Sequence, residues 1–101
     1  SFLMKEDFLI PSTTLAEFYW VLLRDKNNEE AKYWIERLMG FVVDVKGNTL
    51  IRSQKFRYEN KGKNLSFFDC TGYIFALENN SLFVTGDKEF ANLKGVKYIQ
   101  K

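Results

Sequence analysis

The chain has 101 residues, 46% of them hydrophobic and 17% aromatic, and its 15 Lys and Arg against 13 Asp and Glu give a formal net charge of +2. This length and apolar content predict one domain, residues 1–101, with a single core, because two smaller domains would need disulfide or metal staples. With no histidine and one cysteine, Cys70, the composition excludes an intrachain disulfide, a Cys/His zinc site and catalysis by Ser-His-Asp or Cys-His groups.

The hydropathy and charge patterns indicate the compartment and the partners. No apolar run approaches the roughly 18 residues of a membrane span, and residues 1–7 lack the basic-then-apolar layout of a signal peptide. We therefore expect a cytoplasmic protein with no membrane partner. The mildly basic balance is compatible with a polyanionic partner but does not require one.

The first predicted elements are a strand and a helix. Residues 8–12 form an apolar run halted by proline, as expected for a buried strand. One of residues 12–14 can cap a helix that runs to about Arg24, and if Thr14 is the cap, Glu17 has the position of a capping-box carboxylate. Apolar spacing and turn residues predict the remaining elements: a helix from Asn28 to Gly40, a strand at 41–45, a helix at 48–58, a helix from Ser66 to Asn79, a strand at 82–85, a short helix at 88–92 and an edge strand at 96–99.

Strands thus alternate with helices along the chain, and the buried strands are near-continuous apolar runs. This pattern predicts an α/β fold with a parallel sheet covered by helices on both faces. Most of the aromatic side chains are expected in its core.

Three acidic residues are candidates for a functional site, because open parallel sheets carry their sites beyond the carboxyl ends of the strands. Glu17 lies about one turn into the first helix, Asp69 lies in the first turn of the helix after Ser66, and Asp87 follows the strand at 82–85. Each also has a structural explanation as a carboxylate that caps a helix or interacts with its N-terminus. If the three converge, their repulsion requires a cation, and Mg²⁺ or Mn²⁺ suits a site made only of oxygen ligands.

Several segments together resemble one protein family. Residues 65–79 have the pattern Leu-Ser-x-x-Asp at the start of an apolar helix, and residues 82–90 contain a strand that leads into Thr-x-Asp-x-x-Phe. Residues 93–99 fit a closing strand, and residues 10–17 are similar to a second strand and its acidic helix. These features resemble the PIN-domain family, in particular its VapC-type toxin ribonucleases. Gly72 replaces a residue that is often alanine in the family helix, which weakens the helix by up to about 1 kcal/mol.

The resemblance implies a three-layer α/β/α fold and a nuclease site that depends on Mg²⁺ or Mn²⁺. Glu17, Asp69 and Asp87 match three acidic positions of the family, where they would bind the metal and act in catalysis. Thr85 matches a hydroxyl position that supports the site, although it also suits a plain strand end. The strand and helices that carry the family's first aspartate are not matched, and Asp7 is a poor substitute. We therefore expect a truncated chain, or completion of the site by another copy.

Two functions from different classes compete. The leading hypothesis is an endonuclease for single-stranded RNA, plausibly the toxin of a toxin–antitoxin pair, with an antitoxin protein and a second copy of itself as partners. The alternative is a catalytically incomplete PIN-like module that binds RNA or protein, with rings near Tyr19, Trp20 and Trp34 in a dimer interface if they are not in the core. A different doubly wound fold is disfavoured, because the chain has no Gly-rich phosphate loop. Four basic residues either steer RNA through its phosphates or form a solvated face: Arg52, Lys55, Lys61 and Lys63.

Overall fold

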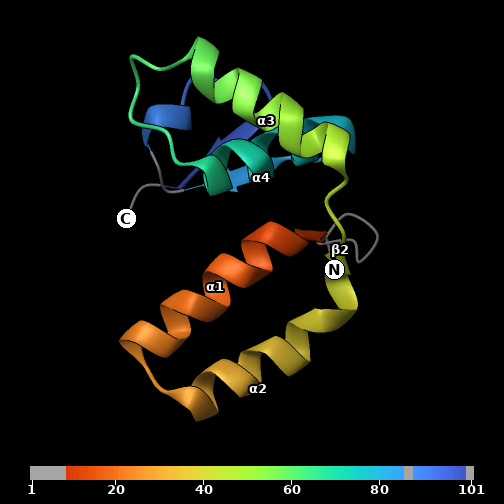
Figure 1. Cartoon of the computed structure of the whole chain (residues 1–101), viewed down its shortest axis with the longest axis vertical. Helices are drawn as coiled ribbons and strands as arrows, with labels where there is room; N and C mark the ends of the chain where they lie inside the picture. Colours follow the sequence, from red (N-terminus) through yellow and green to blue (C-terminus); the bar gives the residue numbers. More distant parts are fainter. Residues whose placement is uncertain (1–8, 86–87, 100–101) are drawn as a thin grey trace. The chain divides into compact units, whose positions relative to one another are not determined.

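The computed structural model describes residues 9–85 and 88–99, with the helices and strands shown in Figure 1. The chain divides into two compact units, Ser1–Val45 and Lys46–Lys101. Within the described residues, each unit contains two α-helices and one two-stranded parallel sheet. The prediction of an α/β fold with parallel strands is therefore confirmed. Because these strands form two separate sheets, the single sheet of a three-layer arrangement stays a prediction.

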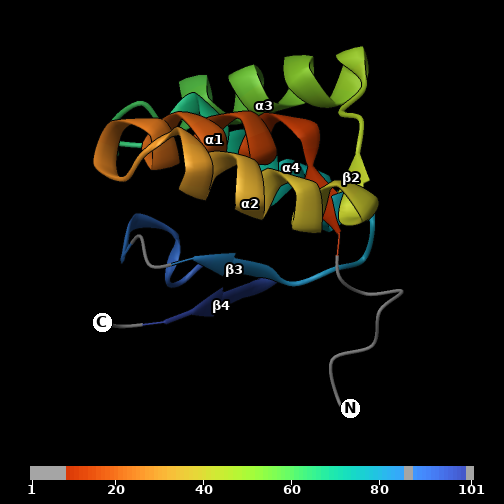
Figure 2. The same cartoon turned by 90° about the horizontal axis from the view of Figure 1, so that it is seen from below.

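The first unit combines a helical hairpin with a short sheet. Its elements are β1 (Ile10–Pro11), α1 (Ser12–Asp25), α2 (Asn28–Leu38), the 3₁₀ helix η2 (Met39–Phe41) and β2 (Val42–Val43). The two α-helices lie side by side in both views (Figures 1 and 2), and β1 pairs in parallel with β2, with Ile10 opposite Val42. The longer helix, α1, has 14 residues, and no helix in the described part of the chain is long and apolar enough to cross a membrane.

The start of α1 differs from the sequence prediction. The helix begins at Ser12 after Pro11, which has extended backbone and provides no side-chain cap. The hydroxyl of Ser12 instead accepts a hydrogen bond from the N–H of Val45 at 3.1 Å, which ties the start of α1 to the chain just after β2. Thr14 therefore lies inside the helix, and the prediction that Thr14 and Glu17 form a capping box is wrong. A tertiary hydrogen bond has taken the place of a local one.

The start of α2 is shifted by one residue from the prediction. Asn27, not Asn28, is the N-cap, and its side-chain oxygen accepts a hydrogen bond from the N–H of Glu30 at 2.7 Å. Glu29 and Glu30 lie in the first turn, where negative charge interacts favourably with the helix N-terminus. The cap and these two carboxylates account for a well-defined helix start.

The second unit contains the longer apolar segments. Its elements are α3 (Gly47–Glu59), α4 (Phe67–Glu78), β3 (Phe83–Thr85), the 3₁₀ helix η3 (Lys88–Phe90) and β4 (Val96–Tyr98). β3 and β4 are parallel, with Phe83 opposite Val96 and Thr85 opposite Tyr98, and Figure 2 shows them side by side. All five elements were predicted, with each observed strand shorter than its apolar run.

The core of the second unit is built around α4. All residues from 70 to 76 are buried, so this helix has no solvated face there, as expected for one that is apolar all round. The Tyr73 ring lies 5.2 Å from the Phe56 ring and 5.8 Å from the Phe90 ring, measured between centroids. Its hydroxyl donates a hydrogen bond to the carbonyl of Lys94 at 2.9 Å, so the one polar atom of the ring is satisfied.

Candidate active site

Asp69 is held at the start of α4 by a helix cap. The preceding Ser66 has extended backbone, and its hydroxyl accepts a hydrogen bond from the N–H of Asp69 at 3.0 Å. The prediction that Ser66 caps this helix is confirmed. Asp69 is half-buried, and its carboxylate lies in the turn where the helix dipole favours negative charge. Interaction with the helix N-terminus and metal binding are therefore compatible roles for Asp69.

The other predicted site residues lie on different elements. Glu17 is half-buried on α1 in the first unit. Thr85 is the last residue of β3 in the second unit, and its carbonyl accepts a hydrogen bond from the N–H of Ile99 at 2.9 Å. Asp87 lies outside the described residues. The structure therefore puts Asp69 and Thr85 in one unit and Glu17 in the other.

The predicted metal ligands suit a metal ion by their chemistry, but their grouping into one site is a separate question. Carboxylate oxygens are the ligands that Mg²⁺ and Mn²⁺ prefer, so the donor set fits a hard cation. Within residues 9–85 and 88–99, however, no three Asp, Glu or Cys side chains gather closely enough to hold a metal ion. Because Glu17 lies in the other unit and Asp87 lies outside the described residues, the three-carboxylate site stays a prediction.

The four basic residues singled out in the sequence are in different environments. Arg52 forms an ion pair with Glu78, which also accepts a hydrogen bond from the Thr49 hydroxyl. The charge of Arg52 is therefore partly neutralised within the fold. Lys55 is exposed on α3 and does not line the surface pocket that follows this helix. Lys61 and Lys63, by contrast, line a surface pocket after the end of α3.

This basic pocket has a volume of about 440 Å³ and brings together residues that the sequence analysis did not connect. It is lined by Gln54, Arg57, Tyr58, Lys61, Lys63, Asn64 and Leu65. Three of these side chains are cationic and none is acidic. The signal that could have found it is the i, i+4 spacing of Arg57 and Lys61 across the predicted end of a helix, followed by Lys63 in a polar loop.

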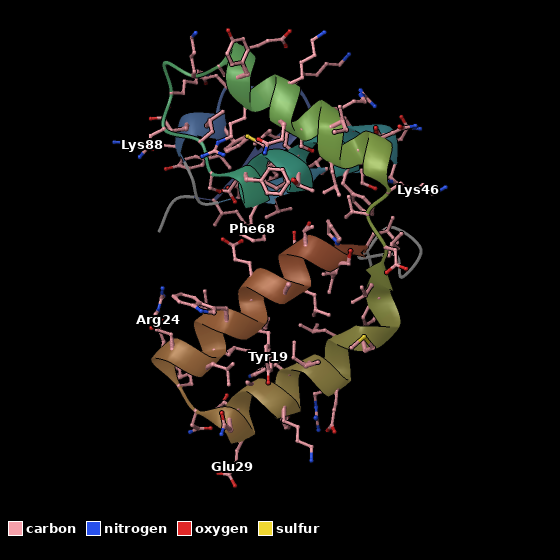
Figure 3. All side chains as sticks on the ribbon, viewed as in Figure 1. Tyr19, Arg24, Glu29, Lys46, Phe68 and Lys88 are labelled. Carbon is pink, nitrogen blue, oxygen red and sulfur yellow. The ribbon has the colours of Figure 1, made fainter. Side chains whose placement is uncertain are left out.

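The aromatic side chains of the helical hairpin are more exposed than predicted. Tyr19, Trp20 and Trp34 are 43%, 58% and 40% exposed, so their assignment to the core is wrong (Figure 3 labels Tyr19). Two of these rings have a polar partner. The guanidinium of Arg24 lies 4.8 Å from the Trp20 centroid, and the Trp34 indole N–H donates a hydrogen bond to Glu30 at 3.2 Å. The rings are thus anchored at a surface.

A comparison with known families decides where the chain belongs. The family model of the PIN domain matches residues 1–96. The chain belongs to the PIN-domain family. The matched region includes Glu17, Asp69, Thr85 and Asp87, and membership indicates a nuclease-like fold. No curated protein and no solved structure matched the chain.

In this PIN domain, Cys70 is an unreactive core residue. It is fully buried beside Asp69, and burial raises the pKa of its thiol to about 11, with Asp69 adding to the rise and Arg57 opposing it. At neutral pH the thiol is therefore protonated and is a poor nucleophile. The basic pocket and Asp69 both belong to the second unit, and Leu65 of the pocket wall directly precedes Ser66, which caps the N–H of Asp69.

Proposed function

We propose that this PIN domain is an endonuclease that cleaves single-stranded RNA with Mg²⁺ or Mn²⁺. The observation that carries the proposal is the family match over residues 1–96, which includes carboxylates at three positions that suit a hard cation. Glu17, Asp69 and Asp87 would hold the ion. A divalent ion bound there would lower the pKa of a water molecule and offset charge on the phosphate under attack.

The residues of the chain itself would position the substrate. The Ser66 cap holds the backbone of Asp69 in place at the start of α4. Thr85, at the end of β3, has a hydroxyl suited to orienting a carboxylate or a water molecule. The cations of the basic pocket would attract the phosphates of a nucleic-acid strand. With no histidine in the chain, proton transfer falls to carboxylates and water.

The proposal extends to the biological setting. A toxin of a toxin–antitoxin pair would act as a homodimer and would be blocked by an antitoxin protein. The exposed rings of α1 and α2 support such partners, because Tyr and Trp are enriched in protein interfaces. Light scattering of the purified chain over a range of concentrations tests the homodimer, and a monomer at every concentration would contradict it.

The nuclease is tested by incubating a labelled single-stranded RNA with the purified protein and Mg²⁺ or Mn²⁺. We expect cleavage that stops on chelation and is lost in Asp87→Asn, Asp69→Asn and Glu17→Gln. The matched control is Glu36→Gln, which removes an exposed carboxylate from α2 and should leave cleavage unchanged.

Two outcomes would contradict the nuclease. Cleavage that persists in Asp87→Asn and in Asp69→Asn would rule out the proposed carboxylate site. RNA binding without cleavage, by protein that circular dichroism shows to be folded, would favour the second candidate, a PIN-like binding module. The basic pocket favours that candidate if cleavage is absent, because it can hold a phosphate without a metal.

A further inference from the structure

The basic pocket concentrates positive charge on a small, concave surface. Arg57, Lys61 and Lys63 line it together, and no acidic side chain does. A net charge of +2 for the whole chain means that this local excess is not a general property of the surface. A pocket with three cations at its wall favours an anion, and the attraction is strongest for a group that carries its charge on several oxygens, such as a phosphate.

Arg57 is held in place by the core. Its Nε donates a hydrogen bond to the carbonyl of Leu65 at 3.2 Å, and Leu65 is buried in the main hydrophobic cluster. The guanidinium is therefore held through its Nε atom by the backbone of a core residue. A cation that is already positioned loses less conformational entropy when an anion binds.

The loop after α3 removes a repulsion that would otherwise oppose an anion. A helix C-terminus presents unpaired carbonyls with partial negative charge. Here the carbonyl of Phe56 accepts hydrogen bonds from the N–H and the side chain of Asn60, and the carbonyl of Tyr58 accepts one from the N–H of Lys61. Because these carbonyls have N–H partners, fewer unpaired carbonyls oppose an anion at this end of the helix.

Tyr58 adds a flat aromatic surface beside the cations. Its ring is 67% exposed, and the ammonium of Lys61 lies 4.6 Å from the ring centroid. Aromatic rings next to basic grooves bind single-stranded nucleic acids by stacking with a base while the cations hold the backbone. A free phosphate or an acidic peptide would use the cations but would gain nothing from an exposed ring.

We infer that the basic pocket binds a phosphodiester of single-stranded RNA, with the adjoining base stacked on Tyr58. The pocket is a substrate-positioning site that lies on the chain just before Ser66 and Asp69, so a strand held there approaches the start of α4. The choice of RNA as the ligand rests on the proposed function. The pocket's affinity for a strand is a separate property, which can be measured without cleavage.

The test is fluorescence anisotropy of a labelled single-stranded oligoribonucleotide with the full chain in a chelator, so that no cleavage occurs. We expect the double variant Lys61→Gln/Lys63→Gln to bind about tenfold more weakly, and the slope of log affinity against log salt to fall by about 1.4, since each phosphate contact contributes about 0.7. Tyr58→Ala should weaken binding about fivefold, whereas Tyr58→Phe keeps the ring and should bind like the wild type.

The matched control is Lys32→Gln/Lys46→Gln, which removes the same charge from exposed positions on α2 and just before α3, outside the pocket. Equal loss of affinity in both double variants would overturn the inference, because binding would then follow total charge. Equal affinities of Tyr58→Ala and the wild type would also overturn it, as would binding of a poly-glutamate peptide in place of RNA. Circular dichroism of each variant verifies folding, and all five side chains are exposed, so their replacement leaves the core intact.

The experiments distinguish a wrong inference about the pocket from a wrong proposal of nuclease activity. If the wild type cleaves RNA but the pocket variants bind and cleave as it does, the pocket inference is wrong and the nuclease stands. If the wild type binds through the pocket but does not cleave, the nuclease is wrong and the pocket stands.

Discussion

The Phe83 ring lies directly against the backbone of Gly72. A Cβ atom at position 72 would be 2.9 Å from Cε1 of Phe83, which is closer than real Cβ contacts allow. The ring has little freedom to move away, because it packs against Tyr73 and Phe90 with centroid distances of 5.9 and 5.3 Å. Gly72 therefore lets β3 approach α4, which gives this glycine a packing role despite its low helix propensity.

Gly72→Ala should destabilise the protein although alanine is the better helix former. Helix propensity alone favours alanine by up to about 1 kcal/mol, whereas overpacking a filled core costs about 1–3 kcal/mol. We expect a net loss of about 1 kcal/mol in the free energy of unfolding, measured by urea denaturation. Gly47→Ala is the control, because open space surrounds Gly47 at the start of α3. Higher stability of Gly72→Ala would show that Phe83 can move.

The Ser66 cap should affect both stability and catalysis. Ser66→Ala removes the acceptor for the Asp69 N–H and should cost about 1 kcal/mol of stability. It should also lower cleavage, since Asp69 would lose its fixed position. Asn27→Ala removes the corresponding cap of α2 at a similar cost and should leave cleavage unchanged once the folded fraction is equal. Equal effects of the two variants on kcat would mean that the Ser66 cap acts only through stability.

Cys70 should make the protein less stable at high pH. Because the folded-state pKa of its thiol is raised from 9.0 to about 11, the folded protein holds this proton more tightly than the unfolded chain does. The resulting stability is fully present below pH 9 and is lost as the pH rises to 11, by on the order of 2 kcal/mol. Urea denaturation between pH 8 and 11 measures the loss.

Cys70→Ala is the control for that pH dependence and should show a smaller loss over the same range. Burial also raises the pKa of Tyr73, so a residual decline is expected in this variant. Iodoacetamide at pH 8 should modify the native protein much more slowly than the unfolded chain. Rapid alkylation of the native protein would contradict the burial of this thiol.

Thr71 should be replaceable by valine with a gain in stability. The side chain is fully buried in α4, and its hydroxyl has no hydrogen-bond partner among residues 9–85 and 88–99. Thr71→Val keeps the shape and removes a polar group whose burial costs about 1–3 kcal/mol, so we expect a gain of about 1 kcal/mol. Thr71→Ser keeps the hydroxyl and deletes a methyl group, and should lose about 1 kcal/mol. A destabilised valine variant would indicate a partner for the hydroxyl.

Helix and strand positions were predictable because they depend on local patterns. The apolar run of α4 and the Ser66 cap are both visible in the sequence, and both were predicted correctly. The start of α2 was predicted one residue late, because Asn27 and Asn28 have similar capping ability. At α1 no side chain caps the helix, and the Ser12 hydroxyl bonds instead to Val45, a residue 33 positions away. Sequence spacing contains no information on such a contact.

The individual residues of the candidate site were predictable, but their arrangement in space was not. The sequence identifies Asp69 and Thr85 as residues at the ends of elements, but their convergence with Glu17 depends on tertiary arrangement. The pocket was missed for a similar reason, since Arg57 joins Lys63 only when the chain turns after α3. The aromatic residues of the hairpin were predicted to be buried from composition and helical spacing, but they are exposed, and Arg24 lies against the Trp20 ring.

The two parallel sheets differ in how far apart their strands lie along the chain, which bears on the order of folding. Ile10 pairs with Val42 across 32 positions, whereas Phe83 pairs with Val96 across 13. Closing the longer loop costs about 0.8 kcal/mol more in chain entropy. Of the two sheets, the one later in the chain is therefore the easier one to close. Although β1 and β2 come earlier in the sequence, the aromatic core around α4 is expected to nucleate first and β1 to pair with β2 later.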